Sequence, residues 1–252
     1  MKISDRIHTA FAGNRRGKNA VEQPTVYLRR KLLENGADLV GFADLSVLPT
    51  VAHRGFPTGV ALAVKYPKEV IRGISELPTL DYFSHYNRLN EKLDQLVNLG
   101  AKLLTNLGYN AFAQTIEAAV WNEETCATLL PHKTVATRAG LGWIGKCALL
   151  VTEPFGSMVR LSSLLTDAPL ETAQPIEEAK CGDCRICAIA CPAGAVKGTP
   201  WTPSTDRAAF FDALACQSMA KQRSKAGFGL DATVCGKCIE ICPYTRRYLN
   251  AD

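Results

Sequence analysis

The sequence contains the stretch Cys181-Gly182-Asp183-Cys184-Arg185-Ile186-Cys187-Ala188-Ile189-Ala190-Cys191-Pro192, whose spacing is C-x2-C-x2-C-x3-C-P. A second run reads Cys235-Gly236-Lys237-Cys238-Ile239-Glu240-Ile241-Cys242-Pro243, with the spacing C-x2-C-x3-C-P. Cysteine thiolates at these intervals hold [4Fe–4S] clusters, and in two-cluster proteins the cysteine before the proline ligates the other cluster. The two runs therefore predict a pair of [4Fe–4S] clusters in a ferredoxin-like fold.

Each cluster needs four thiolates, and the second run lacks one early cysteine. Cys216 is the candidate for the missing ligand of the second cluster. Because the fourth cysteine of the first run opens a helix that points away from its own loop, we expect the ligation to be crossed. One cluster is then held by Cys181, Cys184, Cys187 and Cys242, and the other by Cys191, Cys216, Cys235 and Cys238.

Zinc and disulfides are the alternatives for these cysteines. Zinc sites also use C-x2-C pairs, but they rarely place three cysteines two apart and follow them with Cys-Pro. Disulfides belong to oxidising compartments, and nothing in the sequence marks the chain as secreted. We therefore favour iron–sulfur clusters over both.

The composition is that of an ordinary globular protein. The 252 residues are 47% hydrophobic and 21% charged, which allows one large domain or two modest ones. The net charge of +5 fits either an acidic or phosphate-bearing partner or an ordinary solvated surface. We found no apolar run near the ~20 residues of a membrane span, and the residues after Arg15-Arg16 are too polar for an export signal. We expect a cytoplasmic protein.

Hydrophobic periodicity predicts a mixed α/β core before the cysteine runs. The expected helices cover residues 25–35, 79–107 and 132–139, and the expected strands cover residues 37–43 and 60–64. Residues 111–119 fit either a strand or a helix.

Two more strands are expected later in the chain. Residues 147–152 and 158–165 are predicted to form a hairpin with its turn at Pro154–Gly156. The cysteine runs are separated by an insertion, residues 196–234, with a predicted helix around residues 207–220.

Gly140-Leu141-Gly142-Trp143-Ile144-Gly145 matches the dinucleotide pattern G-x-G-x-x-G. A dinucleotide site needs a strand before this pattern and a helix after it. Here the order is reversed, so we reject a nicotinamide site. The glycines instead indicate a tight turn or a bulky group packed against the backbone.

Three further motifs resemble those of a known enzyme family. They are Thr137-Arg138-Ala139-Gly140-Leu141-Gly142-Trp143-Ile144-Gly145-Lys146, Phe155-Gly156-Ser157 and Leu164-Leu165-Thr166-Asp167-Ala168-Pro169-Leu170. Together with the cysteine array, they resemble the epoxyqueuosine reductase family of cobalamin-dependent enzymes with two [4Fe–4S] clusters, which is related to the reductive dehalogenases. The resemblance implies an α+β protein. Residues 1–170 would form a mixed α/β cobalamin-binding domain of nitroreductase or dehalogenase type, and residues 171–252 the two-cluster ferredoxin-like domain.

The resemblance also assigns residues to the cofactor. Ser218 matches a family serine at the corrin, and Gly236 falls near the corrin. Leu150 and Leu161 match apolar positions that line the cofactor, although simple core packing explains them equally well. The remaining cofactor-binding candidates come from the glycine motif and are Arg138, Gly142 and Lys146.

The catalytic candidates depart from the family pattern. Cys126 stands twelve residues before Arg138, where the family carries a proton-donating aspartate. A thiol there is either a functional proton donor or a small buried hydrophobe. Nearby alternative donors are Glu123, Glu124, His132 and Lys133. His85-Tyr86 corresponds, in reversed order, to a family Tyr-His pair near the substrate, and a capping or core role is equally plausible.

The leading functional interpretation is a cobalamin-dependent reductase with an external low-potential donor, ferredoxin or flavodoxin. The missing aspartate, and the end of the chain at Asp252 where the tRNA-modifying enzymes continue, lead us to expect a small-molecule or corrinoid-linked substrate in place of tRNA. The basic tract near the clusters fits a solvated surface better than nucleic acid. The alternative is an iron–sulfur electron-transfer or activating protein without a substrate of its own. We expect no membrane partner.

Overall fold

The computed structural model describes residues 22–251 and centres on one four-stranded sheet. Residues 1–21, with which the first predicted domain begins, lie outside the described part. The strands run in the order β1-β2-β8-β3, and each neighbouring pair is antiparallel. Their bounds are Leu39–Asp44 for β1, Thr58–Lys65 for β2, Ala111–Gln114 for β3 and Val159–Thr166 for β8. Thus β1, β2 and the mixed α/β core are confirmed, and the ambiguous residues 111–119 begin as a strand.

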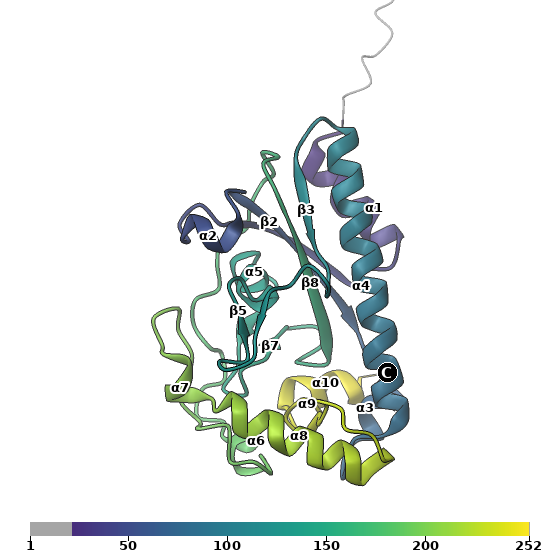
Figure 1. Ribbon diagram of the computed structural model, residues 1–252, viewed down its shortest axis with the longest axis vertical. Coiled ribbons are helices and arrows are strands. Elements are labelled where there is room, and N and C mark those ends of the chain that lie inside the picture. The colour runs from purple at the N-terminus through teal and green to yellow at the C-terminus, as the bar shows by residue number, and fades with distance from the viewer. Residues whose placement is uncertain (1–21, 252) are drawn as a thin grey trace, which may run out of the picture.

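Two helices cover one face of this sheet (Figure 1). They are α1, Pro24–Glu34, and α4, Leu80–Asn106, both as predicted. Thr79 caps α4, because its hydroxyl accepts a hydrogen bond from the Tyr82 amide at 3.2 Å. Leucines of α1 and α4 pack with Val60, Leu62 and Leu164 of the sheet. This layer is the main hydrophobic core.

The opposite face carries the short helix α5, His132–Arg138. Val135 and Ala136 of α5 pack against Ala61 and Leu165. Gly59 allows the close approach, because a Cβ there would lie 2.7 Å from Val135 Cγ1. The small helix α2, Thr50–His53, and the two-stranded pair β4, Trp121–Asn122, and β5, Ala127–Thr128, complete this side.

The predicted hairpin of residues 147–152 and 158–165 is wrong. The short strand β7, Leu150–Val151, pairs with β6, Trp143–Ile144, whereas β8 pairs with β2 and β3. The Pro154–Gly156 turn closes only the small bridge between Thr152 and Gly156. Most of β8 is buried, so its apolar residues are better accommodated in the centre of the sheet than in an isolated hairpin.

The C-terminal helices gather beneath one end of the sheet in Figure 1. They are α6, Ile186–Ile189; α7, Arg207–Phe210; α8, Ala213–Phe228; α9, Lys237–Glu240; and α10, Pro243–Asn250. The single helix predicted around residues 207–220 is therefore two helices. The helix is interrupted at Phe211, which has an extended backbone. The Asp212 side chain then caps α8, because it accepts a hydrogen bond from the Ala215 amide at 3.0 Å.

The N-terminal and C-terminal parts share a hydrophobic cluster. Ile71 in α3, Lys68–Arg72, and Ile74 just after it pack with Ile239 and Leu249 of the C-terminal helices. None of the helices in residues 22–251 is long and apolar enough to span a bilayer.

Candidate functional site

The first predicted set of cluster cysteines surrounds one small cavity. Cys181, Cys184, Cys187 and Cys242 all line a space of about 120 Å³. Burial and the neighbouring Cys181 and Cys187 raise the pKa of the Cys242 thiol. The C-terminal run thus folds back onto the first run, as crossed ligation requires. Cys238, which we assign to the other cluster, lines the same cavity.

The second set forms around Cys216 on α8. Burial, together with the nearby Cys235 and Cys191, raises the pKa of the Cys216 thiol to about 11. The insertion therefore brings Cys216 beside one cysteine of each run. Within residues 22–251, no three His, Cys, Asp or Glu side chains converge as the ligands of a single metal ion would. The cysteine positions fit two clusters, and the ligand assignment itself stays a prediction.

Lys146 holds the cluster-binding loop, and Cys147 lies beside it. Lys146 is 5% exposed, and its ammonium donates to the carbonyl oxygens of Gly182 at 2.7 Å and Cys184 at 3.0 Å. The Cys147 thiol is buried, and Cys147 lines the cluster cavity together with Cys187 and Cys238. Lys146, a cofactor-binding candidate from the sequence, thus contacts the iron–sulfur loop.

The glycine motif serves close packing. Helix α5 precedes it and strand β6 lies within it, which confirms the reversed order. A Cβ on Gly142 would lie 2.2 Å from the Val151 carbonyl oxygen, and one on Gly145 would lie 3.6 Å from Cys181 Sγ. The motif therefore brings β7 and the cluster loop close to the backbone.

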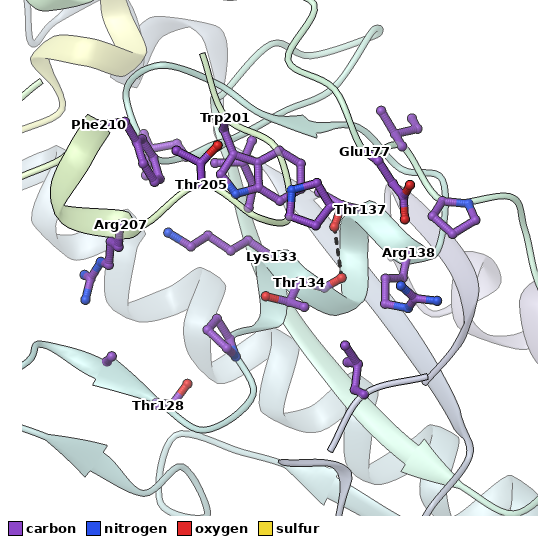
Figure 2. Close-up of a pocket in the computed structure, with 18 of the residues that line it drawn as sticks. Thr128, Lys133, Thr134, Thr137, Arg138, Glu177, Trp201, Thr205, Arg207 and Phe210 are labelled. Atoms are coloured by element: carbon purple, nitrogen blue, oxygen red, sulfur yellow. Dashed lines mark hydrogen bonds between the residues drawn. The ribbon is translucent and has the colours of Figure 1, made fainter. Parts of the chain in front are cut away.

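A much larger cavity, of about 620 Å³, opens beside the same segment. Its lining comes from α5, from the β4–β5 pair, from residues 175–177 and from the insertion, whose Trp201, Arg207 and Phe210 face it (Figure 2). A second cavity of about 170 Å³ adjoins it, because Lys133, Leu149 and Arg160 line both. The two cavities together lie between the α/β core and the C-terminal part.

Four of the predicted site residues line these cavities. Cys126 and Arg138 line the larger one, and Leu150 and Leu161 line the smaller one. Cys126 is 6% exposed and has a positive φ of 48°, and its Sγ lies 3.6 Å from the Glu123 carbonyl oxygen. The left-handed backbone is unusual for a non-glycine residue and marks a constrained loop.

The other predicted residues lie outside the cavity linings. Ser218 is exposed on α8, and Gly236 packs against Ile74 and Tyr82 at the start of α9. His85 contacts Asp81 within α4. Tyr86 reaches the site indirectly, since the Arg160 guanidinium lies 4.2 Å from the centre of its ring.

Sequence reasoning missed the contributions of Arg160, Trp201, Arg207 and Phe210. Arg207 donates to the carbonyl oxygens of Thr125 at 2.6 Å and Cys126 at 2.9 Å, so it fixes the loop that carries Cys126. Its position in an insertion between two cysteine runs was the available signal, because such insertions often carry functional side chains.

The cavities offer groups that fit a large amphipathic cofactor such as cobalamin. Leu149, Leu150 and Leu161 supply an apolar surface. The Tyr66 hydroxyl and Arg207 Nε are buried and have no hydrogen-bond partner within the described residues. Burial raises the pKa of Tyr66 to about 12, so it remains a donor. Such unpartnered donors suit the carboxamide side chains of a corrin.

Comparison with known proteins agrees with this geometry. Residues 180–245 match the family described as 4Fe-4S double cluster binding domain. An epoxyqueuosine reductase from Salmonella typhimurium is 32% identical over 173 residues, which are 67% of this chain and 42% of that protein. The chain spans about half the length, or less, of the curated relatives it matches.

Two solved structures show the same fold. A reductive dehalogenase described as B12-dependent superposes with a TM-score of 0.70 at 18% identity, covering 91% of this chain and 33% of the dehalogenase. An epoxyqueuosine reductase superposes with a TM-score of 0.58 at 21% identity, covering 87% of this chain and 65% of that one. The chain thus resembles the epoxyqueuosine reductases in sequence and shares the fold of these two structures, and its residues 180–245 match the 4Fe-4S double cluster binding domain.

Proposed function

We propose that this protein is a cobalamin-dependent iron–sulfur reductase of the epoxyqueuosine reductase type. The observation that carries the proposal is the position of residues 144–149 between the large cavity of about 620 Å³ and the small cavity lined by the cluster cysteines. Ile144 and Leu149 line the large cavity, whereas Lys146 and Cys147 line the cluster cavity. A cofactor in the large cavity is therefore one short loop away from the cluster cysteines, which favours electron transfer between them.

In this proposal residues 1–170 form the cobalamin-binding domain and residues 171–252 the cluster domain. Leu149, Leu150 and Leu161 would pack against the corrin, while Tyr66 would donate to its polar side chains. Bound there, cobalamin would supply a cobalt centre that is both nucleophile and reductant, and the clusters would supply single electrons.

Two proton-bearing side chains are placed to serve a substrate. Cys126 and Lys133 both line the large cavity, whereas Glu123 and Glu124 are exposed. Tyr86 acts through Arg160, whose guanidinium also donates to Asn90 Oδ1 at 2.9 Å. We propose Cys126 or Lys133 as the proton donor and Tyr86 as a positioning residue. Among the described residues, the contacts of His85 are with Asp81 in its own helix, which do not support a catalytic role.

The proposed partners are a low-potential ferredoxin or flavodoxin as the electron donor and a small-molecule or corrinoid-linked substrate. One solved epoxyqueuosine reductase is bound to an epoxyqueuosine-modified tRNA stem loop, so tRNA is the competing substrate. Titration of the loaded protein with that stem loop and with small electrophiles, followed by the cobalt absorption spectrum, separates the two.

The direct test is anaerobic reconstitution with iron, sulfide and cobalamin. We expect two clusters and one cobalt per chain, and a cob(II)alamin signal by electron paramagnetic resonance. Retention of both clusters without any corrinoid would contradict the proposal.

That outcome would favour the alternative, an electron-transfer or activating protein for a corrinoid partner. A specific observation supports this second function: Ile189, between Cys187 and Cys191, is 82% exposed. An exposed apolar side chain beside a cluster suits the docking of a redox partner.

A further inference from the structure

The large cavity is strongly basic. Lys133, Arg138, Arg160 and Arg207 line it, and Glu177 is the one acidic lining residue in the described part of the chain. Within residues 22–251, none of the four basic side chains forms an ion pair with a carboxylate. Positive groups gathered around a half-enclosed space without counter-charges repel one another, because the local dielectric is low.

The basic groups occupy two sides of the cavity. Arg138 and Glu177 lie on one side, and the Lys133 ammonium extends toward the side of Arg207 (Figure 2). Arg138 is partly compensated, since its charge helps to lower the pKa of Asp44. On the other side, the charge of Arg207 acts on the Lys133 ammonium.

The positive charge in the cavity affects the protonation of Lys133. Its ammonium donates to the Ala148 carbonyl oxygen at 2.8 Å, and none of the carboxylates in residues 22–251 is paired with it. Burial, together with the positive charge of Arg207, lowers the pKa of Lys133 to about 8. A partly buried ammonium that lines a cavity is normally matched by an anion.

Arg207 retains an unused donor. Its two terminal nitrogens bind the carbonyl oxygens of Thr125 and Cys126, but its Nε is buried and unpartnered within the described residues. The neighbouring wall is apolar and aromatic, with Trp201 and Phe210. The lining therefore offers cations for one end of a ligand and aromatic surface for the rest.

We infer that this cavity binds a small organic anion, whose carboxylate or phosphate is bound by Lys133 and Arg207 and whose apolar body packs against Trp201 and Phe210. The inference rests on the proposed function, because it names the class of substrate that the reductase takes. The phosphodiester of cobalamin has the same anionic chemistry, so the test must separate cofactor from substrate.

The experiment is calorimetric titration of the cluster-loaded protein, first without and then with cobalamin. The anionic probes are benzoate, 4-hydroxybenzoate and inorganic phosphate, and benzamide is the neutral counterpart of benzoate. We expect at least one anion to bind, and benzoate to bind at least ~10-fold more tightly than benzamide, which is about 1.4 kcal/mol. Failure of all three anions, with cobalamin binding intact, overturns this inference and leaves the proposed function standing.

Three variants identify the cation. Lys133→Gln should weaken anion binding roughly tenfold, and Lys133→Arg, which keeps the charge, should restore it to within about threefold. Lys102→Gln is the matched control, because Lys102 is exposed on α4 and remote from the cavity. Unchanged affinity in Lys133→Gln would overturn the assignment.

The pH dependence gives a second readout. Lys133 loses its proton as the pH rises through its pKa, so anion affinity should fall above about pH 8 in the wild type and not in Lys133→Gln. The groups around Lys133 are Arg207, Arg160, Arg138 and Glu177 in the lining, the thiols of Cys126 and Cys147, and the neighbouring His132.

Cobinamide lacks the phosphodiester of cobalamin. It therefore shows whether the cations bind the phosphodiester of the cofactor or the anion of a substrate. If Lys133→Gln weakens cobalamin but not cobinamide, and no anion binds the cobalamin-loaded protein, then the cations bind the cofactor and the inference is overturned. If both corrinoids bind equally well in wild type and variant while anions still bind the loaded protein, the inference is supported.

Discussion

Arg207 is hydrogen-bonded to Cys126 across 81 positions of sequence, with 2.9 Å between its terminal nitrogen and the Cys126 carbonyl oxygen. A second bond from the same guanidinium reaches the Thr125 carbonyl oxygen at 2.6 Å. Arg207 belongs to the insertion between the cysteine runs, and Cys126 belongs to the loop beyond the sheet. The cluster-binding part therefore fixes the loop that lines the proposed substrate cavity.

Arg207→Gln should loosen this loop. Loss of the two hydrogen bonds from a charged donor, each worth roughly 1.5–3 kcal/mol, should make the buried Cys126 thiol react at least tenfold faster with a thiol reagent. Mass spectrometry of the Cys126 peptide measures the rate, and Lys197→Gln, an exposed change in the same insertion, is the control. An unchanged rate would mean that other contacts hold the loop.

Lys146→Met should impair the first cluster. The Lys146 ammonium is the shared donor to the Gly182 and Cys184 carbonyl oxygens, so its loss leaves the cysteine loop less fixed. We expect the reconstituted variant to lose up to about half of its iron and the remaining cluster signal to be unaltered. Lys197→Met serves as the matched control. Full iron content in Lys146→Met would assign it a packing role only.

Cys216→Ala tests the crossed ligand assignment. Cys216 lies near Cys191 and Cys235, so its removal should cost one cluster and leave the other, with iron falling to about half. Cys147→Ala, the replacement of a buried cysteine outside both ligand sets, should keep both clusters. An iron content equal in Cys216→Ala and wild type would break the assignment.

Gly142→Ala should destabilise the fold around β6 and β7. The new Cβ would meet the Val151 carbonyl oxygen at 2.2 Å, and backbone cannot move away as a side chain can. Overpacking of this kind costs about 1–3 kcal/mol, which denaturant unfolding can measure. Gly73→Ala is the control, since a Cβ there meets nothing closer than 3.5 Å and its φ of −71° is ordinary.

His132 should make the protein less stable as the pH falls. Burial lowers the pKa of His132 from 6.5 to about 4, with Arg160 contributing, so the unfolded chain takes up a proton that the folded chain does not. The contribution of neutral His132 to the free energy of unfolding is therefore fully present above about pH 6.5 and is lost as the pH falls toward 4. Between about pH 7.5 and about pH 5.5 the expected loss is on the order of 1.4 kcal/mol.

The comparison variant is His132→Gln, which cannot take up that proton. Urea unfolding at several pH values should give a flatter profile for His132→Gln than for the wild type. Parallel profiles would show that His132 does not control this part of the pH dependence.

The sequence by itself determined the clusters and most elements of the core. The spacing of the cysteines is a local geometric requirement, so Cys181 to Cys191 indicate a cluster loop without knowledge of the fold. The same holds for α4, where apolar residues recur at helical spacing and Thr79 and Gly108 mark the ends.

The tertiary structure alone decided where β8 pairs and what surrounds the cavity. Strand pairing depends on which face is buried, so β8 joins β2 and β3 in the sheet although a turn precedes it. Lys133, Arg160 and Arg207 come from three separate elements, and no spacing in the sequence relates them. They meet because the insertion packs over α5, and long-range packing of this kind leaves no local pattern to read.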